Sequence, residues 1–294
     1  MKTTGRVPHA GAAVVVALLL GARPVPAAAA GDHDGCTGFI DEVPVVILTP
    51  GTWCLRSDLA FAVDIAEIAI DVQADGVTID CHDRRLVGKV GAYPLPRWAI
   101  VSYKRATTVR HCDVEAFQIP IETHGNDSIV EFNHVRGARE RGILMTGNNG
   151  TVRRNVVDKV VGAGGVHSGR AFGISVHGSI DVIDNTVSGV RSAEGSDAWG
   201  ILAAWNESPD ETVIVSGNRV RDVVPSDGGE SAGIAVKLDR YVVRGNMVTV
   251  PDAGVGVYCQ SGSDGARLSD NIVIGGTLSP LWSCPESTGN VAKN

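Results

Sequence analysis

The sequence has no excess of basic charge, no low-complexity segment and no linker. Its 33 acidic residues outnumber 26 lysines and arginines, so the formal net charge is −7. Binding to duplex or single-stranded nucleic acid needs a basic stripe, which the sequence does not show. Because no composition shift or charge run marks a second domain, we expect one domain that follows a short N-terminal segment.

The sequence has one long apolar run, at residues 10–20, and no second one follows it. Residues 1–30 begin with Lys2 and Arg6, continue through an apolar stretch at 10–20 and end in small residues. This order is typical of a secretory signal peptide, whereas a membrane anchor would need a longer span. We expect cleavage near Ala30, which removes three basic residues and changes the charge from −7 to −10. The mature protein, residues 31–294, would be secreted or periplasmic and would not insert into a membrane.

The chain has no repeat of fixed length, but a short Val-x-x-Asn-x-Val frame, once with Leu in place of the first Val, occurs six times. The asparagines of these frames are Asn133, Asn155, Asn185, Asn218, Asn246 and Asn271. Their spacings of 22, 30, 33, 28 and 25 residues are typical of stacked coils with loops of variable length. Asparagine suits a corner because it tolerates a left-handed backbone and its amide can bond to the next coil, so we predict an asparagine ladder.

A second series of short apolar segments lies between these frames. The central residues of the segments are Ile100, Ile119, Ile143, Ile174, Ile201, Ile234 and Val255. Each segment can bury its apolar face only against equivalent segments above and below, which predicts parallel strands. Over about residues 43–284 the arrangement resembles the right-handed parallel β-helix superfamily that includes pectate lyases. We expect an all-β, single-stranded right-handed parallel β-helix, with an N-terminal cap and first coil at 31–60 and a C-terminal cap at 277–294.

Six cysteines fit an exported, oxidised protein. Cys36 and Cys54 bracket the N-terminal coil, and Cys259 and Cys284 bracket the last one. We therefore expect two disulfides that staple the ends of the helix.

The remaining two cysteines, Cys81 and Cys112, fall at or next to the ladder position of neighbouring coils. They form either a third disulfide, which we favour slightly, or a pair of free thiols. A zinc site that adds His82 and His111 is a weaker alternative, because the usual Cys-x-x-Cys spacing is absent.

Strand alternation assigns the residues of the apolar series to the core or to the surface. With the central residue as position zero, position +2 points inward and position +3 points outward. The outward column then contains Tyr103, Glu122, Thr146, His177, Ala204, Lys237 and Tyr258. Position −2 turns inward by the same alternation, which favours an aromatic-rich core stack over the alternative of a sugar-binding platform. Its members are Trp98, Phe117, Arg141, Phe172, Trp199, Ala232 and Ala253.

Three consecutive coils carry long loops beside the outward column. The distance from ladder asparagine to the next central residue is 19, 16 and 16 residues in these coils, against 10 and 9 in their neighbours. Stacked loops form a wall, where binding groups gather. The polar residues of these loops are His167, Arg170, Arg191, Glu194, Asp197, Asp227 and Glu230. Beyond them, an insertion begins at Trp205, which suits stacking on a sugar, and contains Glu207.

The resemblance implies a specific chemistry for these groups. Polysaccharide lyases of this fold remove the proton beside a uronic carboxylate with a Lys, Arg, His or Tyr base, while a cation or an Arg neutralises the carboxylate. Lys237 and His177 stand two coils apart, roughly 10 Å by the strand spacing. With Arg170 on the wall they provide a base, a partner and a neutralising charge. We therefore predict Lys237, His177 and Arg170 as catalytic residues, with no required cofactor and Ca²⁺ as an alternative.

The substrate-binding residues that accompany this hypothesis are Trp205, Tyr103, Glu122, Tyr258, His167, Asp197, Glu207 and Glu230. Two other functions stay open. A glycoside hydrolase needs a carboxylate pair, such as Asp197 with Glu207 or Glu230, although the Asn-Thr-Asp and Asp-Asp motifs of such enzymes are absent. A non-catalytic extracellular or envelope protein would use the helix only as a stiff scaffold. We expect a monomer that binds a carbohydrate polymer, with lyase activity as the leading enzymatic hypothesis.

Overall fold

A computed structural model describes residues 35–62, 67–89, 96–162, 169–193, 195–204, 212–237, 240–251, 254–260, 266–276, 281–284 and 286–293. They all belong to one compact unit, residues 33–294. The regular elements among them are β-strands, and each strand pairs in parallel with its neighbours. A search of these residues finds no helix long and apolar enough to cross a membrane. The expected signal peptide at 1–30 lies outside the described residues.

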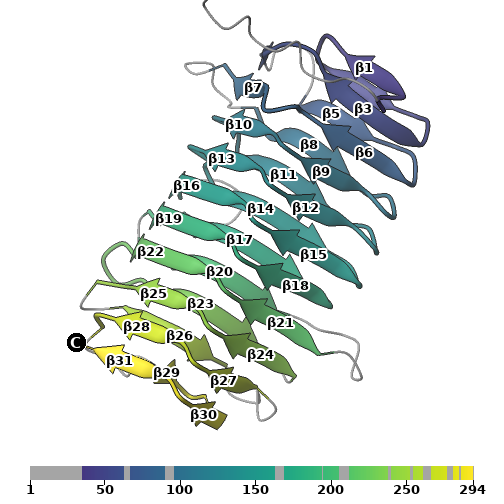
Figure 1. The fold of residues 1–294 in the computed structure, drawn as a ribbon. Coiled ribbons are helices and arrows are strands. Elements are labelled where there is room, and N and C mark those ends of the chain that lie inside the picture. The colour runs from purple at the N-terminus through teal and green to yellow at the C-terminus, as the bar shows by residue number, and fades with distance from the viewer. Residues whose placement is uncertain are drawn as a thin grey trace, which may run out of the picture. The chain divides into compact units, whose positions relative to one another are not determined.

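The described strands form three parallel sheets (Figure 1). Sheet A contains β1 (Gly38–Ile40), β3 (Gly51–Leu55), β6 (Val77–Asp80), β9 (Thr108–Arg110), β12 (Ile129–Glu131), β15 (Gly150–Arg153), β18 (Ile180–Ile183), β21 (Val213–Ser216), β24 (Tyr241–Arg244), β27 (Arg267–Ser269) and β30 (Glu286–Thr288). Sheet B contains β2 (Val45–Ile47), β5 (Ile68–Val72), β8 (Trp98–Ser102), β11 (Ile119–Thr123), β14 (Arg141–Thr146), β17 (Ala171–His177), β20 (Ala198–Ala204), β23 (Ser231–Lys237), β26 (Val255–Cys259) and β29 (Leu281–Trp282). Sheet C contains β4 (Leu59–Phe61), β7 (Arg85–Gly88), β10 (Asp113–Glu115), β13 (His134–Arg136), β16 (Val156–Val161), β19 (Thr186–Arg191), β22 (Arg219–Val224), β25 (Met247–Thr249), β28 (Ile272–Ile274) and β31 (Val291–Lys293). The chain passes from sheet B to A to C in each coil, which confirms the predicted parallel β-helix.

The core contains a row of aliphatic side chains from each sheet. In sheet B, Ile121 pairs with Ile143, and in sheet A, Val130 pairs with Val152. These side chains are fully buried. Each contributes about 1.5–3 kcal/mol by leaving water, and it does so only because the next coil covers it. The strands β29, β30 and β31 each extend one sheet, so the described part of the segment 277–294 continues the coil pattern.

The predicted asparagine ladder lies at the corner between sheets A and C. Each side-chain Nδ2 donates to the Oδ1 of the next asparagine over 2.8–3.0 Å, from Asn133 through Asn271 to a seventh member, Asn290. The amides also bond to the backbone: Asn133 Nδ2 donates to the carbonyl of Val109, and Asn155 Oδ1 accepts the N–H of Asn133. The ladder therefore satisfies buried polar groups at each turn. The sequence frame missed Asn290 because no flanking valine precedes it.

The left-handed residue at this corner is the one before the asparagine. Phe132, Arg154 and Asp184 have φ of 55°, 55° and 56°, and Gly217 has φ of 67°. The expectation that the asparagine itself takes this conformation is therefore wrong. Asparagine is required for its amide, which has to reach two neighbouring coils at once.

All six cysteines form disulfides. The bonded pairs are Cys36–Cys54, Cys81–Cys112 and Cys259–Cys284. The first and last confirm the predicted staples, and the middle one decides the open alternative in favour of a bridge. This bridge consumes the two thiolates that a zinc site would need. The N–H of Cys112 donates to Asn133 Oδ1, so the bridge occupies the coils just before the ladder begins.

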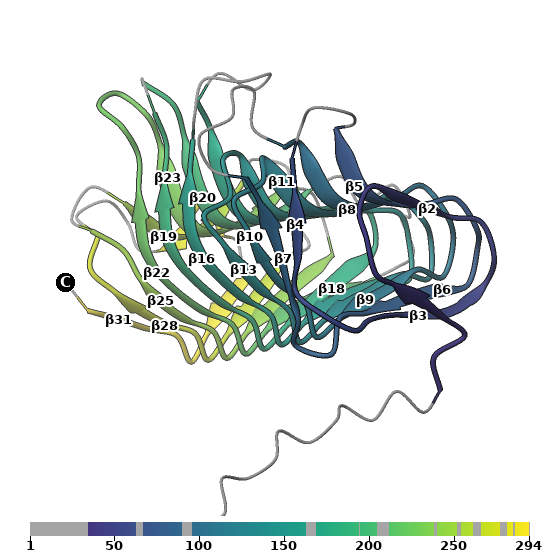
Figure 2. The same cartoon turned by 90° about the horizontal axis from the view of Figure 1, so that it is seen from above.

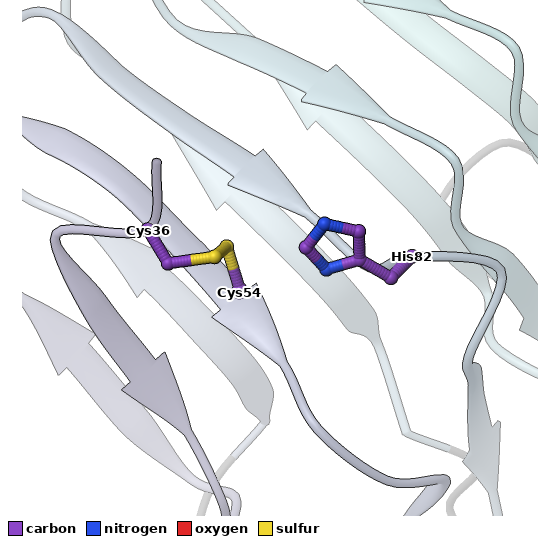
Figure 3. Close-up of side chains that lie close together, drawn as sticks. All are labelled: Cys36, Cys54 and His82. Atoms are coloured by element: carbon purple, nitrogen blue, oxygen red, sulfur yellow. A yellow bond between two sulfur atoms is a disulfide. The ribbon is translucent and has the colours of Figure 1, made fainter. Parts of the chain in front are cut away.

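His82 lies beside the Cys36–Cys54 disulfide (Figure 3). One ligand-type atom from each of the three residues lies within 4.8 Å of the others. Because both sulfur atoms are already bonded to each other, they are not thiolates, and the cluster does not form a metal site.

Three coils are extended at the corner where sheet C leads into sheet B, as the loop lengths predicted. Residues 158–161, 188–191 and 221–224 pack against residues 169–172, 196–199 and 229–232, and we call this feature the wall. Its interior is made of small side chains, which include the fully buried Val160, Val190, Ala171 and Ala198. Figure 2 shows β20 and β23 as long curved strands in this region. The wall raises one side of the outer face of sheet B.

Candidate functional site

One glycine per coil marks the line where the wall meets sheet B. A Cβ on Gly173 would lie 2.4 Å from Val187 Cγ1, and one on Gly200 would lie 2.4 Å from Val220 Cγ1. Each glycine therefore faces the core, and so does the isoleucine that follows it, so the alternation of faces is interrupted here. Position −2, on the other side of the glycine, faces outward.

This interruption corrects the predicted inward stack at position −2 for Arg141, Phe172 and Trp199, whereas Phe117 is fully buried in the main core as predicted. Phe172 and Trp199 belong to an apolar cluster separate from the main core, and both line an external groove together with Arg141. Their rings are only 5% and 6% exposed. They form the apolar floor of the groove rather than an open platform.

The register of β11 also differs from the predicted one. Ile121, rather than Ile119, is aligned with the central isoleucines of β8 and β14. Glu122 therefore lies at position +1 instead of +3, still on the outer face. His124 takes the place at +3 that the sequence analysis gave to Glu122.

A groove of about 520 Å³ lies on the outer face of sheet B beside the wall. It is lined by His124, Arg141, Leu144, Thr146, Arg170, Phe172, Ser175, His177, Asp197, Trp199, Leu202, Ala204 and Lys237. Four of the residues predicted for the site line this groove, namely Lys237, His177, Arg170 and Asp197.

His177 lies near the middle of the groove and is uncharged at neutral pH. It pairs with Ala204, which in turn pairs with Lys237, so His177 and Lys237 are two strands or about 10 Å apart. The methyl group of Ala204 leaves space between them. Burial, followed by the positive charges of Arg141, His124 and Lys237, lowers the pKa of His177 to about 4. Ser175 Oγ lies 3.0 Å from His177 Nε2 and helps to hold the ring.

Two cations lean toward His177 from opposite sides. The Arg141 guanidinium lies 5.0 Å from the ring centre of Phe172 on the next strand, and Lys237 Nζ lies 5.4 Å from the ring centre of Trp199 on the preceding strand. Each cation is thus held over an aromatic ring of the adjacent strand that lies toward, or is the same as, the strand of His177. Arg141 was not predicted as a groove residue, because strict alternation of strand faces places it in the core.

Arg170, the residue expected to neutralise the substrate, lies at the rim of the wall. Its Nε is 3.6 Å from Asp197 Oδ2, and Asp197 Oδ1 accepts the backbone N–H of Glu230 over 3.1 Å. Arg170 is therefore paired with a carboxylate, as is Arg141, whose Nε lies 3.4 Å from Glu140 Oε1. Its charge is not among those that lower the pKa of His177, whereas the charge of Arg141 is.

A hydrogen-bonded cluster occupies the end of the groove nearer the N-terminus. Glu122 is 5% exposed, accepts a bond from Trp98 Nε1 and lies 2.5 Å from His124 Nε2. His124 Nδ1 is 2.7 Å from Thr146 Oγ1, and the Tyr103 ring stacks on His124 at 4.6 Å. Burial raises the pKa of Glu122, but the bonds from His124 and Trp98 outweigh it, so the pKa falls and the carboxylate is ionised.

The other predicted contacts are placed as follows. Tyr258 lies at position +1 because Val257, not Val255, aligns with Ile234, and its ring centre is 6.0 Å from that of Trp199. Trp205, His167 and Glu207 lie outside the described residues.

The described groove residues do not fit a calcium site. Ca²⁺ takes six to eight oxygen ligands, mostly from carboxylates and carbonyls. Of the described carboxylates on this face, Glu122 and Asp197 are three strands or about 14 Å apart, and Asp71 on β5 lies farther still from Asp197. Glu122 is engaged by Trp98 and His124, and Asp197 by Arg170.

Comparisons with known proteins identify the fold. No protein-family model matches the sequence, and no curated protein matches it. Among solved structures, an alginate lyase from Paenibacillus sp. str. FPU-7 is similar, with a TM-score of 0.56 and 13% identity over 83% of this chain and 89% of that one. The pectate lyase Pel9A is similar with a TM-score of 0.50 and 12% identity over 83% and 70% of the two chains. At these identities the likeness shows the fold alone, which is the right-handed parallel β-helix.

Proposed function

We propose that this right-handed parallel β-helix protein binds an acidic polysaccharide on the outer face of sheet B and cleaves it by β-elimination. One observation carries the proposal: a neutral His177 lies between two cations, Arg141 and Lys237, beside the space over Ala204. A neutral imidazole can accept a proton, and two nearby cations can hold a carboxylate and stabilise the charge that develops beside it.

The reaction requires three groups in this arrangement. The carboxylate of a uronic acid pairs with Arg141, which makes the neighbouring C5 proton more acidic. A ring nitrogen of His177 accepts that proton, a double bond forms between C4 and C5, and the C4–O bond breaks. The Lys237 ammonium gives a proton to the leaving oxygen. In this scheme Lys237 acts as the acid, Arg141 takes the role expected of Arg170, and Arg170 binds substrate at the rim.

The low pKa of His177 fits this scheme because three of its causes are positive charges, and two of these belong to Arg141 and Lys237. A bound carboxylate offsets the positive charges of Arg141 and Lys237, so the pKa of His177 should rise when substrate binds. The base would then be ready in the free enzyme and become a stronger acceptor in the complex.

The disulfides support the expected location. Three bridges in one chain fit an oxidising compartment, where secreted and periplasmic proteins fold. We infer export to the extracellular space or the periplasm, where polysaccharides are met as polymers.

The direct test is incubation of the purified protein with a panel of uronic-acid polysaccharides, followed by ultraviolet absorbance of the unsaturated product. We expect absorbance to grow with at least one polymer. Arg141→Met should abolish most of the signal, whereas the matched variant Arg170→Met should mainly weaken binding. Absence of cleavage with every polymer, together with retained binding, would favour a non-catalytic glycan-binding protein instead.

A further inference from the structure

The positive charges of Arg141 and Lys237 lie near the centre of the groove. A sugar unit in an extended glycan spans about 5 Å, close to the ~4.8 Å between neighbouring strands. A chain that follows the groove across the strands therefore places about one sugar over each coil. The outward side chains of each strand therefore indicate which kind of sugar that coil can contact.

Among the described groove residues, the arginine and lysine that stand on the strands themselves, Arg141 and Lys237, belong to the central coils. Arg141 on β14 and Lys237 on β23 lean inward over β17 and β20. On the C-terminal side, the described outward residues of β26 include Val255 and Tyr258, which pack with the apolar cluster of the floor. A neutral sugar can cover such a surface with its apolar face.

The N-terminal flank is acidic. Asp71 on β5 and Glu122 on β11 occupy the same outward row, with Val101 between them. Glu122 is ionised and buried. The basic groups Arg97 and His124 on this flank already face carboxylates. Arg97 lies over the Trp98 ring and 3.9 Å from Glu67, and His124 Nε2 lies 2.5 Å from Glu122, which leaves Asp71 without a basic partner among the described residues.

A chain with a carboxylate on every sugar would meet these acidic groups. Like charges within a few ångströms in a partly buried site repel strongly enough to change affinity severalfold. We propose that the substrate is a heteropolysaccharide in which the uronate at the centre of the groove has neutral sugars on both sides. The inference rests on the proposed function for the location of the site, and it adds the substrate class.

The test compares two kinds of polymer on a variant that binds without turnover, His177→Ala. Gellan and hyaluronan carry a uronate between neutral sugars, whereas polygalacturonate and alginate carry one at every position. Affinity electrophoresis should give a dissociation constant at least tenfold lower for a polymer of the first kind. Equal or tighter binding of the homopolymers would overturn the inference, and so would failure of all four to bind.

A charge variant tests the cause of the preference. Glu122→Gln keeps the size and an acceptor for Trp98, and it should reduce the preference about three- to tenfold by improving homopolymer binding. Glu131→Gln is the matched control, because Glu131 is a similarly buried carboxylate that pairs with Arg153 on sheet A. If Glu122→Gln lowers the melting temperature, Asp71→Asn replaces it with the same expectation. An unchanged preference in a folded variant would contradict the inference.

Cleavage assays on the wild type separate this inference from the proposed function. Selective binding of gellan or hyaluronan without any unsaturated product would uphold the substrate class and reject the lyase. Cleavage of polygalacturonate or alginate at least as fast as of the heteropolymers would uphold the lyase and reject the substrate class.

Discussion

In the proposed reaction, His177 is the residue that accepts the proton. Burial makes protonation of His177 unfavourable, and the positive charges of Arg141 and Lys237 add to this effect. The same features that keep the ring neutral also make it sensitive to an incoming anion. A buried histidine with a low pKa is therefore suited to respond to an acidic substrate, whereas an exposed one would titrate near 6.5 whether or not substrate is present.

Replacement of His177 by alanine should lower turnover by about 100-fold or more, the usual scale for loss of a general base. Turnover on a cleavable polymer gives the measurement. His134→Ala is the matched control, because His134 lies on the outer face of sheet C and should leave turnover unchanged. Activity retained in His177→Ala would show that another group accepts the proton.

The same variant should change how stability depends on pH. The folded pKa of His177, about 4, is below the unfolded value of 6.5, so the unfolded chain binds more protons in this window. Stability is therefore lost as pH falls from about 6.5 to about 4. His177→Ala should flatten that loss in denaturant titrations, and an identical slope for variant and wild type would contradict the low pKa.

At the scale of elements, the repeated frames allowed most of the fold to be predicted. The Val-x-x-Asn-x-Val frame fixed the corner between sheets A and C, because only a stacked asparagine can bridge two coils there. The prediction failed where the local backbone geometry interrupts the alternation of side chains between the two faces of a strand. Gly173 and its equivalents face the core together with the next isoleucine, so residues before the glycine, such as Arg141 and Trp199, reverse their side.

The error in β11 has a similar physical origin. Ile119 and Ile121 are both apolar and two residues apart, so alternation alone cannot say which one is aligned with Ile100. Pairing with the neighbouring strands chooses Ile121. The face that carries the groove and three of its charged residues could therefore be predicted from the sequence, whereas Arg141 and His124 could not.

The ladder gives a prediction about stability. In Asn185→Ala, the side-chain and backbone N–H groups of Asn155 lose the oxygen that accepts them, in a site closed to water. We expect a loss of about 2–5 kcal/mol in the free energy of unfolding, measured in urea. Asn290→Ala removes the equivalent acceptor from Asn271 at a more exposed position, where water can replace it, and should cost about 1 kcal/mol. Equal losses would show that the ladder does not act through buried polar groups.

At the scale of the whole molecule, stability is local because each coil contacts only its neighbours. The disulfides Cys36–Cys54 and Cys259–Cys284 lie toward opposite ends of the described chain, where the outermost described strands pair on one side only. Replacing Cys259 and Cys284 by serine should cost about 2–4 kcal/mol, and limited proteolysis should begin in the C-terminal coils. The double serine variant of Cys36 and Cys54 should move the first cuts to the N-terminal coils. First cuts at the same place in both variants would contradict local stapling.

The acidic charge of the whole protein and the cations of the groove fit together in one account. A net charge of −7 disfavours adhesion to polyanions in general, so an acidic glycan is held only where Arg141 and Lys237 gather positive charge locally. Under the proposal, Glu122 and Asp71 limit how many carboxylates a bound glycan can bring to the groove. The proposed recognition of a sparsely charged polymer rests on this balance.

The central claim is that a glycan carboxylate binds between Arg141 and Lys237, beside His177. NMR titration of the histidine ring signals tests it most directly, with the His177 resonance assigned by its loss in His177→Gln. The account predicts a His177 pKa of about 4 in the free protein, rising by about one unit or more when a saturating uronate-containing oligosaccharide offsets the two cations. A His177 pKa that does not change on saturation with the oligosaccharide would contradict it.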